Sequence, residues 1–302
     1  MKTDYFDIIS TVLSENSAQW KSICIDNITY TVFALGYTQL ELPSEGYAFV
    51  DSYYVASNRA YFLRKELCEK LTAAGFETVT CDLPYKNLAY YSGLGTALRS
   101  TLIANELFGT RMALEIVGVR GIFAKEVSIE AVLKKPEMAA FCRTCGICEA
   151  VCPTGCISAD SFERNRCIRS VQESADLTDK TAAKAMGTQL WGCDICQRCC
   201  PFNKHLPTRA MTEREKELYL IDNLYANFSL GKKGCEPYRD ILGGNYLRPS
   251  KLMALTLNVM ANSSDPHKYI PCAEKMKSHA DERVRTAAER LIDKIKNRSD
   301  SK

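Results

Sequence analysis

The chain has 302 residues, of which 46% are hydrophobic and 25% are charged, a composition that is ordinary for a globular protein and excludes a largely disordered chain. The formal net charge is +3, but residues 204–302 carry 19 Lys and Arg against 13 Asp and Glu, whereas residues 1–203 carry 20 against 23. A mildly basic C-terminal part is compatible with a polyanionic partner such as RNA, and equally with a solvated helical surface.

The start of the chain does not have the pattern of a secretion signal, because Asp4 stands where a basic segment is expected and no apolar segment follows. No run approaches the roughly 18 apolar residues that a membrane span requires. Clustered cysteines in a cytosolic chain bind metal or carry out redox chemistry more often than they form disulfides, and the fifteen cysteines form an odd total. We therefore expect a cytoplasmic protein with no membrane partner.

The N-terminal third predicts helices and strands that alternate. Residues 4–15 place Phe6, Ile9 and Leu13 on one helical face, and residues 28–35 form a β-branched and aromatic run that is typical of a strand. A helix is expected over 57–74, with Gly75 just past its end, and further strands over 76–80 and 112–119. This alternation predicts a sheet covered by helices.

The remainder divides into a cysteine-rich module at about 138–203 and a helical part after Pro207. Within the module, residues 157–190 are polar and compatible with helix. The clearest helices are 251–261 and 281–297, with a turn at 263–266 between them and Asp281 as the cap of the second. Residues 250–295 have about the size of one helical-repeat unit.

Two cysteine runs carry the chemistry. The first is Cys142-Arg-Thr-Cys145-Gly-Ile-Cys148-Glu-Ala-Val-Cys152-Pro153, and the second is Cys193-Asp-Ile-Cys196-Gln-Arg-Cys199-Cys200-Pro201. A CxxCxxC loop wraps three thiolates around one side of an iron–sulfur cube, and the fourth ligand comes from elsewhere. In the ferredoxin pattern CxxCxxCxxxCP the last cysteine serves the other cluster. The spacing therefore predicts two [4Fe–4S] clusters.

The same crossing rule yields a ligand assignment. Cluster 1 takes three thiolates of the first run and one of the second: Cys142, Cys145, Cys148 and Cys200. Cluster 2 takes Cys152, Cys193 and Cys196, and its fourth ligand is expected to be Cys167, with Cys156 and Cys199 as rivals. Cys167 is preferred because Cys199 adjoins Cys200 and should point away from cluster 2.

A zinc site is the alternative, since paired CxxC motifs also build zinc ribbons. A ribbon uses two pairs and has no need of the longer CxxCxxCxxxCP run, so the sequence favours iron and sulfur. The other cysteines and the three histidines have no ligand-like spacing and are interpreted as structural or surface residues.

With its second run in the form GCDICQRCCPFN at 192–203, the module resembles the double-cluster domain of epoxyqueuosine reductases. These are cobalamin- and [4Fe–4S]-dependent enzymes of tRNA queuosine synthesis, related to reductive dehalogenases. The family places a lone cysteine in an Arg-Cys-Ile context between the runs, and Arg166-Cys167-Ile168 matches it. The resemblance therefore supports Cys167 independently.

The resemblance extends upstream through Gly93-Leu94-Gly95, Arg99-Ser100-Thr101-Leu102, Phe108-Gly109-Thr110 and Glu115-Ile116. It implies that this region builds the cobalamin-binding half of an active site. The residues implied are Gly93, Gly95, Arg99, Ser100, Thr101 and Gly109. The family's general-acid Asp lies in an Asp-x-x-Pro context. Here Asp82-Leu83-Pro84 is one residue tighter, and the family's Lys-Asn pair is Arg99-Ser100. Asp82 is therefore the candidate acid, or else a turn residue before a proline.

The resemblance implies an α+β fold with three domains. Residues 1–135 are expected to form an α/β nitroreductase-like domain with a cobalamin half-site, 136–206 a ferredoxin-like double [4Fe–4S] domain, and 207–302 a helical HEAT-like region. Electrons would pass from an external ferredoxin- or flavodoxin-type donor through both clusters to cobalamin and an epoxide in tRNA, with the basic C-terminal helices holding the tRNA. Arg248, Lys251, Arg283, Arg285 and Arg290 are the expected phosphate contacts.

Two other functions fit the same sequence. A non-catalytic ferredoxin-like electron carrier would use the cluster module alone, and the altered pair Arg99-Ser100 favours it. A related reductase of a small molecule would keep the chemistry and dispense with tRNA.

Overall fold

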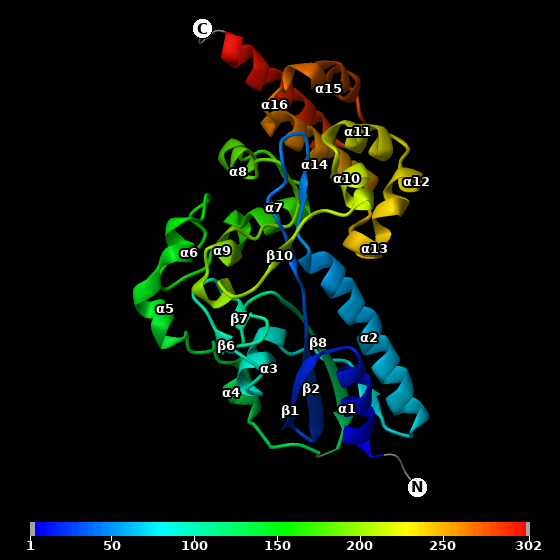
Figure 1. Cartoon of the computed structure of the whole chain (residues 1–302), viewed down its shortest axis with the longest axis vertical. Helices are drawn as coiled ribbons and strands as arrows, with labels where there is room; N and C mark the ends of the chain where they lie inside the picture. The colour runs from blue at the N-terminus through cyan, green and yellow to red at the C-terminus, as the bar shows by residue number, and fades with distance from the viewer. Residues whose placement is uncertain (1–3, 122, 300–302) are drawn as a thin grey trace.

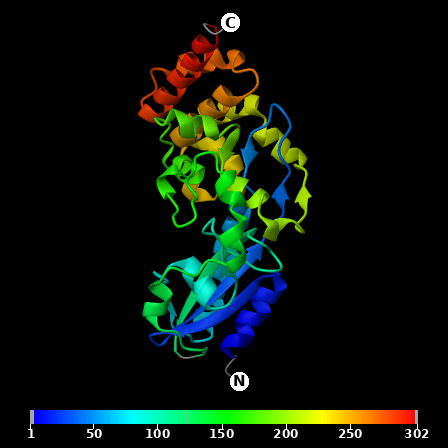
Figure 2. The same ribbon diagram turned by 90° about the vertical axis from the view of Figure 1, so that its left-hand side faces the viewer.

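The computed structural model of the chain describes residues 4–121 and 123–299. The molecule is elongated, with the N-terminal sheet at one end and the C-terminal helices at the other (Figure 1). The cysteine-rich segment lies between these two ends, as the view at right angles also shows (Figure 2). Within the described ranges, no helix is both long and apolar enough to cross a bilayer.

Helices and strands are mixed throughout the chain. The strands are β1 (Gln19–Ile25), β2 (Ile28–Gly36), β3 (Gln39–Leu40), β4 (Phe49–Val50), β5 (Thr78–Val79), β6 (Thr96–Ala97), β7 (Ile103–Ala104), β8 (Met112–Arg120), β9 (Gln189–Trp191) and β10 (Thr208–Arg209). The helices before the second cysteine run are α1 (Tyr5–Glu15), α2 (Tyr53–Ala73), α3 (Tyr85–Tyr91), α4 (Ile129–Leu133), α5 (Ala140–Cys145), α6 (Ile147–Ala150), α7 (Ile168–Ser174) and α8 (Lys180–Ala185). Those that follow are α9 (Ile195–Arg198), α10 (Glu213–Tyr219), α11 (Ile221–Ser229), α12 (Lys232–Cys235), α13 (Arg239–Leu242), α14 (Pro249–Asn262), α15 (Ile270–Met276) and α16 (Glu282–Ser299).

The main sheet has the order β1-β2-β8-β5, and all of its neighbouring strands are antiparallel. Successive side chains of a strand point to opposite faces, so β2 supplies both cores. Phe33 and Leu35 pack with α1 and α2 on one face, whereas Val32 and Ala34 pack with α3 and α4 on the other. The predicted sheet covered by helices is confirmed, and helices lie on both of its faces.

The segment after β2 leaves this sheet and enters the other end of the molecule. There β3 pairs in parallel with β10, and β4 pairs in parallel with β9. Phe49 and Val50 are buried in one core with the C-terminal helices, and Tyr54, in the first turn of α2, packs against Trp191 of β9. Residues that are early in the sequence therefore form part of the C-terminal core, and α2 runs from there back to the sheet (Figure 1).

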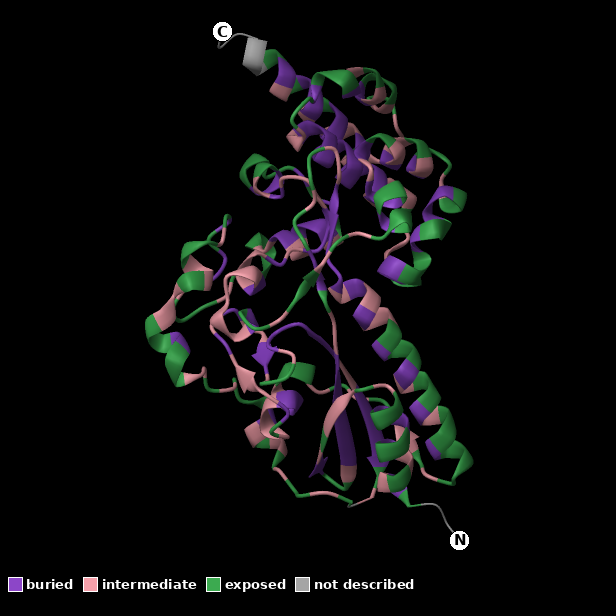
Figure 3. Cartoon of the chain, in the orientation of Figure 1, coloured by how far each residue is buried: buried purple, intermediate pink, exposed green. Residues whose placement is uncertain are grey.

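The C-terminal core is built around α14, whose residues from Leu252 to Ala261 are all buried (Figure 3). It packs against α11 and α16, and α15 packs against α16. Asp281 accepts a hydrogen bond from the backbone N–H of Arg283 at 3.0 Å, which confirms it as the cap of α16. The predicted helices at 251–261 and 281–297 are confirmed to within a few residues.

The predictions missed β1 and α3, and placed the start of α2 four residues late. The first half of β1 is mostly polar, so the strand is recognisable only from its pairing with β2. The expected strand at 76–80 is reduced to Thr78–Val79 at the edge of the sheet.

The α/β part meets the cysteine-rich segment at a close junction. Gly109 has φ +52°, and a side chain there would collide with the Asn203 amide, so glycine is required on both counts. The Asn203 side chain accepts a hydrogen bond from the Thr110 N–H at 2.8 Å and donates to the Thr110 hydroxyl and the Gln197 carbonyl, each at 2.8 Å. A single buried amide thus joins the sheet domain to the second cysteine run.

Asn203→Ala should lower the free energy of unfolding by about 2–3 kcal/mol, because three buried hydrogen bonds are lost and their partners stay buried. Thermal unfolding of the cluster-loaded protein would measure this change. Asn245→Ala, at an exposed position, is the matched control and should be near neutral. Equal stability of the two variants would contradict this role for Asn203.

Candidate metal centre

The first cysteine run folds into two short helices joined by a tight reversal. Cys142 and Cys145 lie on α5, Gly146 adopts φ +62°, and Cys148 lies on α6. The left-handed backbone at Gly146 turns the chain so that the next thiol returns towards the first two. The three thiols of the CxxCxxC segment therefore line the same cavity.

Four thiols from the two runs line a first cavity together. They are Cys142, Cys145, Cys148 and Cys200. Their common cavity places the end of the second run against the first run, as the crossing rule predicts. These are the four cysteines that the sequence groups as cluster 1.

A second cavity, of about 370 Å³, is lined by five cysteines. Four of them are the predicted set Cys152, Cys167, Cys193 and Cys196, and the fifth is Cys156. The sulfur of Cys156 lies 3.4 Å from that of Cys152. Cys199 is placed differently, because it lines a separate cavity together with Asp194 and Arg198. Of the two rival ligands, Cys156 faces the second cavity, whereas Cys199 is not among the residues lining it.

The thiols lie around the walls of these cavities. Among the residues that the structure describes, no group of three or more His, Cys, Asp or Glu side chains is arranged as a site for one metal ion. Buried Ser100, which is 7% exposed, lines both cysteine cavities and therefore lies between them.

Burial and repulsion by neighbouring thiols raise the pKa of some of these cysteines, whereas hydrogen bonds with Thr154 and Cys156 outweigh burial and lower the pKa of Cys152. Burial, followed by the neighbouring thiols Cys199 and Cys142, raises the pKa of Cys148 to about 11. Burial, followed by Cys193 and Cys167, raises the pKa of Cys196 well above its usual value. Because a metal ligand is the thiolate, a cation must offset this cost and protons must be released when it binds.

Basic side chains surround the second cavity. The guanidinium of Arg169 stacks on Tyr53, with 4.2 Å between its central carbon and the ring centroid. Lys86 lines the cavity and is an exposed residue overall, but desolvation of its ammonium group, followed by repulsion from Arg169, lowers the pKa of that group. Neither residue is singled out by the sequence, since α3 and α7 carry no motif at these positions. Arg164 also lines the cavity, and so does Glu173, which pairs with Arg164 at 3.7 Å and with Arg169 at 3.8 Å. The rim therefore keeps a positive excess that is partly neutralised.

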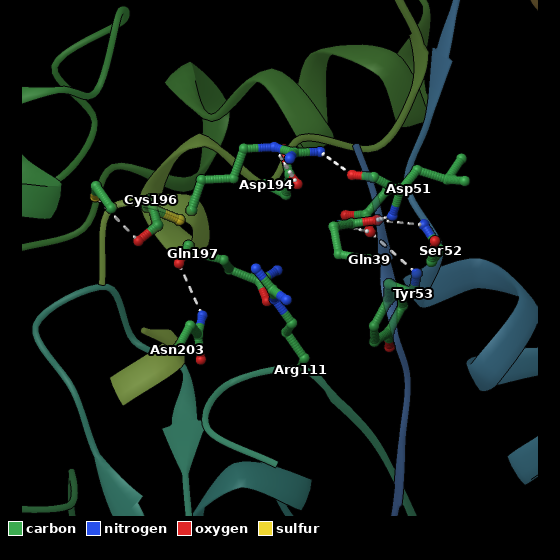
Figure 4. Close-up of polar contacts among 12 residues, drawn as sticks. Gln39, Asp51, Ser52, Tyr53, Arg111, Asp194, Cys196, Gln197 and Asn203 are labelled. Carbon is green, nitrogen blue, oxygen red and sulfur yellow. Dashed lines mark hydrogen bonds and ion pairs between the residues drawn. The ribbon is translucent and has the colours of Figure 1, made fainter. Parts of the chain in front are cut away.

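A network of buried polar groups supports the second cysteine run beside Cys196 (Figure 4). The Gln197 side-chain oxygen accepts hydrogen bonds from the hydroxyls of Tyr37, at 3.1 Å, and Thr110, at 3.2 Å. Asp194 pairs with Arg198 at 2.7 Å, and burial raises the pKa of Asp194 to about 6. This Gln197 network could not be predicted from a local sequence pattern, because it joins residues up to 160 positions apart.

The six residues implied to bind cobalamin are not brought together. Ser100 and Thr101 line the second cavity. Arg99 instead donates to the Cys142 carbonyl at 2.9 and 3.1 Å and pairs with Glu149. Gly109 is used at the Asn203 junction.

The two remaining glycines also lie away from the second cavity's lining residues. A side chain at Gly95 would approach the Ala104 carbonyl oxygen to 2.6 Å, and Gly93 takes φ +76° just after α3. Asp82, the expected general acid, is exposed in the loop between β5 and α3 and is not among the residues that line that cavity.

A family model described as "4Fe-4S double cluster binding domain" matches residues 141–203. Curated relatives are named epoxyqueuosine reductase. The protein from Francisella cf. novicida is 24% identical over 163 residues, which are 52% of this chain and 43% of that protein. The one from Alicycliphilus denitrificans is 28% identical over 57% of this chain and 48% of its own length. The matched region thus spans less than half of these relatives.

Solved structures show the same similarity over more of the chain. A structure of epoxyqueuosine reductase from Bacillus subtilis superposes with a TM-score of 0.67 and 19% identity, covering 88% of this chain and 73% of that one. An epoxyqueuosine reductase crystallised with a tRNA-Tyr epoxyqueuosine-modified stem loop gives a TM-score of 0.61 and 17% identity, covering 89% and 82%. The chain therefore carries a 4Fe–4S double cluster binding domain at residues 141–203, within a fold similar to that of epoxyqueuosine reductases.

Proposed function

We propose that the chain is an iron–sulfur oxidoreductase of the epoxyqueuosine reductase type. Electrons would pass through two [4Fe–4S] clusters to reduce an epoxide in tRNA queuosine synthesis. The observation that carries this function is that cysteines of both runs line two cavities on either side of Ser100, four cysteines in the first cavity and five in the second. The relatives' names and the shared fold support the choice of reaction.

The proposed ligands are the eight predicted cysteines. Cys142, Cys145, Cys148 and Cys200 would hold cluster 1, and Cys152, Cys167, Cys193 and Cys196 would hold cluster 2. Four thiols in one cavity are the donor set that a [4Fe–4S] cluster takes, so the residues present fit both clusters. Arg99 assists cluster 1 indirectly, because its hydrogen bonds to the Cys142 carbonyl hold α5 in place.

An external donor of the ferredoxin or flavodoxin type is proposed to reduce cluster 1. Two exposed apolar side chains line that cavity, Phe141 and Ile147, each at 40%, and Val151, just after α6, is exposed at 39%. Exposed apolar side chains that lie together are typical of a docking surface. Cluster 2 would then pass electrons to an acceptor bound beside it, on the side where Lys86 and Arg169 line the second cavity.

Cobalamin is proposed as that acceptor, bound beside cluster 2 and not within the space of about 370 Å³ that the cluster's own ligands line. Ser100 and Thr101 would hold it, together with Lys86, because hydroxyl and ammonium groups donate to the amide oxygens around a corrin. When bound, it supplies a low-valent cobalt that can reduce an epoxide. The chain's own residues position the substrate beside it, and the positive excess of the rim attracts an anionic substrate to this side of the cavity.

A proton must reach the oxygen that is released when the epoxide opens. Asp82 remains the candidate acid from the resemblance, but it is exposed and outside the cavity lining. Lys86 lines the cavity, and its lowered pKa brings the ammonium closer to the range of a general acid. We therefore propose Lys86 as the proton donor in this chain.

The tRNA is proposed to bind the C-terminal helices, as the neighbour with a bound stem loop suggests. Of the five side chains expected to contact phosphates, four are engaged in hydrogen bonds or ion pairs within the protein. Lys251 donates to the Glu173 carbonyl, Arg283 pairs with Asp281, Arg285 donates to the carbonyls of His279 and Ala280, and Arg290 donates to Asn258. Arg248 is exposed and is the one we retain.

A non-catalytic electron carrier is the second candidate. It is favoured by the structural use of Arg99 and Gly109, which the resemblance implies as cofactor ligands. In that case the clusters would load normally and neither corrinoid nor tRNA would bind.

The loaded protein should contain about eight irons per chain, and Cys200→Ser and Cys167→Ser should each lower this to about four. Iron and sulfide analysis and the visible absorption of anaerobically purified protein would measure it. Cys199→Ser and Cys156→Ser are the matched controls and should keep both clusters. Loss of four irons in a control, with none lost in Cys167→Ser, would reassign the ligand.

Cobalamin added to the anaerobic, cluster-loaded protein should bind at micromolar concentration and show the absorption change of base-off cobalamin. Thr101→Val should weaken this binding because a hydroxyl that lines the cavity is removed. Thr212→Val, which removes the capping hydroxyl of α10 far along the chain, should not. An unchanged spectrum with wild-type protein would favour the electron-carrier function.

Binding of tRNA should weaken steeply as salt rises, because each phosphate contact releases counterions. Arg248→Glu should reduce affinity measured by gel shift at fixed salt, since an exposed cation is reversed. A salt-independent affinity, or an unchanged one in Arg248→Glu, would contradict this surface.

A further inference from the structure

A cavity of about 490 Å³ shares no lining residue with the two cavities proposed for the clusters. Its walls come from the end of β2, the first half of α2 and the segment that follows the second cysteine run. The lining residues that matter are Tyr37, Ser52, Arg59, Phe108, Arg111 and Arg209. Its volume lies in the range of about 300–1,000 Å³ that is usual for small-molecule sites.

The walls of this cavity carry positive charge and no negative charge. Three arginines line it, and the remaining lining residues are hydroxyl-bearing, glycine or apolar. Arg209 is already neutralised, because it forms two hydrogen bonds of 2.7 Å with Glu215. Arg59 lies exposed on α2, and no ion pair involves it among the described residues. The excess charge therefore comes from Arg59 and Arg111.

Arg111 is the unusual member of this set. Its residue is only 5% exposed, yet the guanidinium makes no ion pair within the described part of the chain. One terminal nitrogen donates to the carbonyls of Leu206, at 3.4 Å, and Pro207, at 2.8 Å, while the Nε atom has no hydrogen-bond partner. A buried charge without a counter-charge is costly.

The nearby carboxylates are engaged elsewhere. Asp194 pairs with Arg198, and Asp51 accepts hydrogen bonds from the Gln39 side chain at 2.8 Å and the Tyr53 N–H at 3.0 Å. In Figure 4 no dashed line for a hydrogen bond or an ion pair joins Arg111 to any of the residues drawn. Ser52, at the start of α2, also lines the cavity and has a buried hydroxyl with no partner.

We propose that this cavity binds a phosphorylated small molecule, with its phosphate held between Arg111 and Arg59 and its apolar part against Phe108, Val55 and Leu206. A phosphate matches the planar fork of a guanidinium and supplies the missing counter-charge. The occupied cavity would adjoin cluster 2, because Tyr37 lines it and also donates to Gln197, beside Cys196.

Isothermal titration of the cluster-loaded protein with inorganic pyrophosphate, and separately with inorganic phosphate, tests the site. The wild-type protein should bind pyrophosphate. Arg59→Ala and Arg111→Met should each weaken binding by about tenfold or more, the loss expected for one charge-assisted contact. Lys65→Ala removes an exposed cation from the same helix outside the cavity and should change affinity by no more than about twofold.

Cluster absorption and near-ultraviolet circular dichroism would show whether Arg111→Met folds. If it does not fold, the affinity of Arg59→Ala for pyrophosphate alone tests the site. If the wild-type protein does not bind pyrophosphate at about 10 mM, its dissociation constant is weaker than that of even a marginal, millimolar site. That result would overturn the proposal. Equal weakening by Arg59→Ala and Lys65→Ala would also overturn it, because the attraction would then be a general surface charge. Iron content and tRNA binding are measured separately, so this failure is distinct from a failure of the reductase function.

Discussion

Thiolates that are buried side by side repel one another, and this constraint governs the centre of the molecule. Burial and neighbouring sulfurs together raise the pKa of Cys148 in the first cavity and of Cys196 in the second, so these two thiols are costly to ionise without a cation beside them. The fold nevertheless brings these groups together, through the Gly146 reversal and the Arg99 clamp on the Cys142 carbonyl. An assembly of this kind is stable with its thiolates formed only when iron supplies the opposing charge.

The sequence predicted well wherever the signal was local. The cysteine spacing, the β-branched run of β2 and the apolar stripe of α16 each lie within one short segment, and the structure has an element at each place. The misses are features made by distant partners. The Gln197 network and the Asn203 junction join residues about 90 to 160 positions apart, and no local pattern distinguishes Gln197 or Asn203 from other polar residues.

The residues expected to bind cobalamin illustrate a different limit. Arg99, Ser100 and Thr101 are consecutive and match one motif, yet they face different surroundings. Arg99 holds the first cysteine run, Ser100 lies between the two cysteine cavities, and Thr101 faces the second one and the cavity beside it, lined by Arg99 and Lys135. A motif match predicts which residues correspond to one another along two chains. The role of each side chain depends instead on the residues that pack against it. Lys86 matches no motif, yet its side chain lines the second cysteine cavity and the cavity beside it.

The crossing of residues 37–52 from the sheet into the C-terminal core links the two ends of the molecule. Strands β9 and β10 flank the second cysteine run, and each has its hydrogen-bonded partner on that early segment. A piece of the chain cut out around the cysteines would therefore expose two unpaired strand edges and lose part of its own hydrophobic core. Gene fusions or truncations that treat the cysteine-rich part as a portable ferredoxin should therefore yield protein that aggregates.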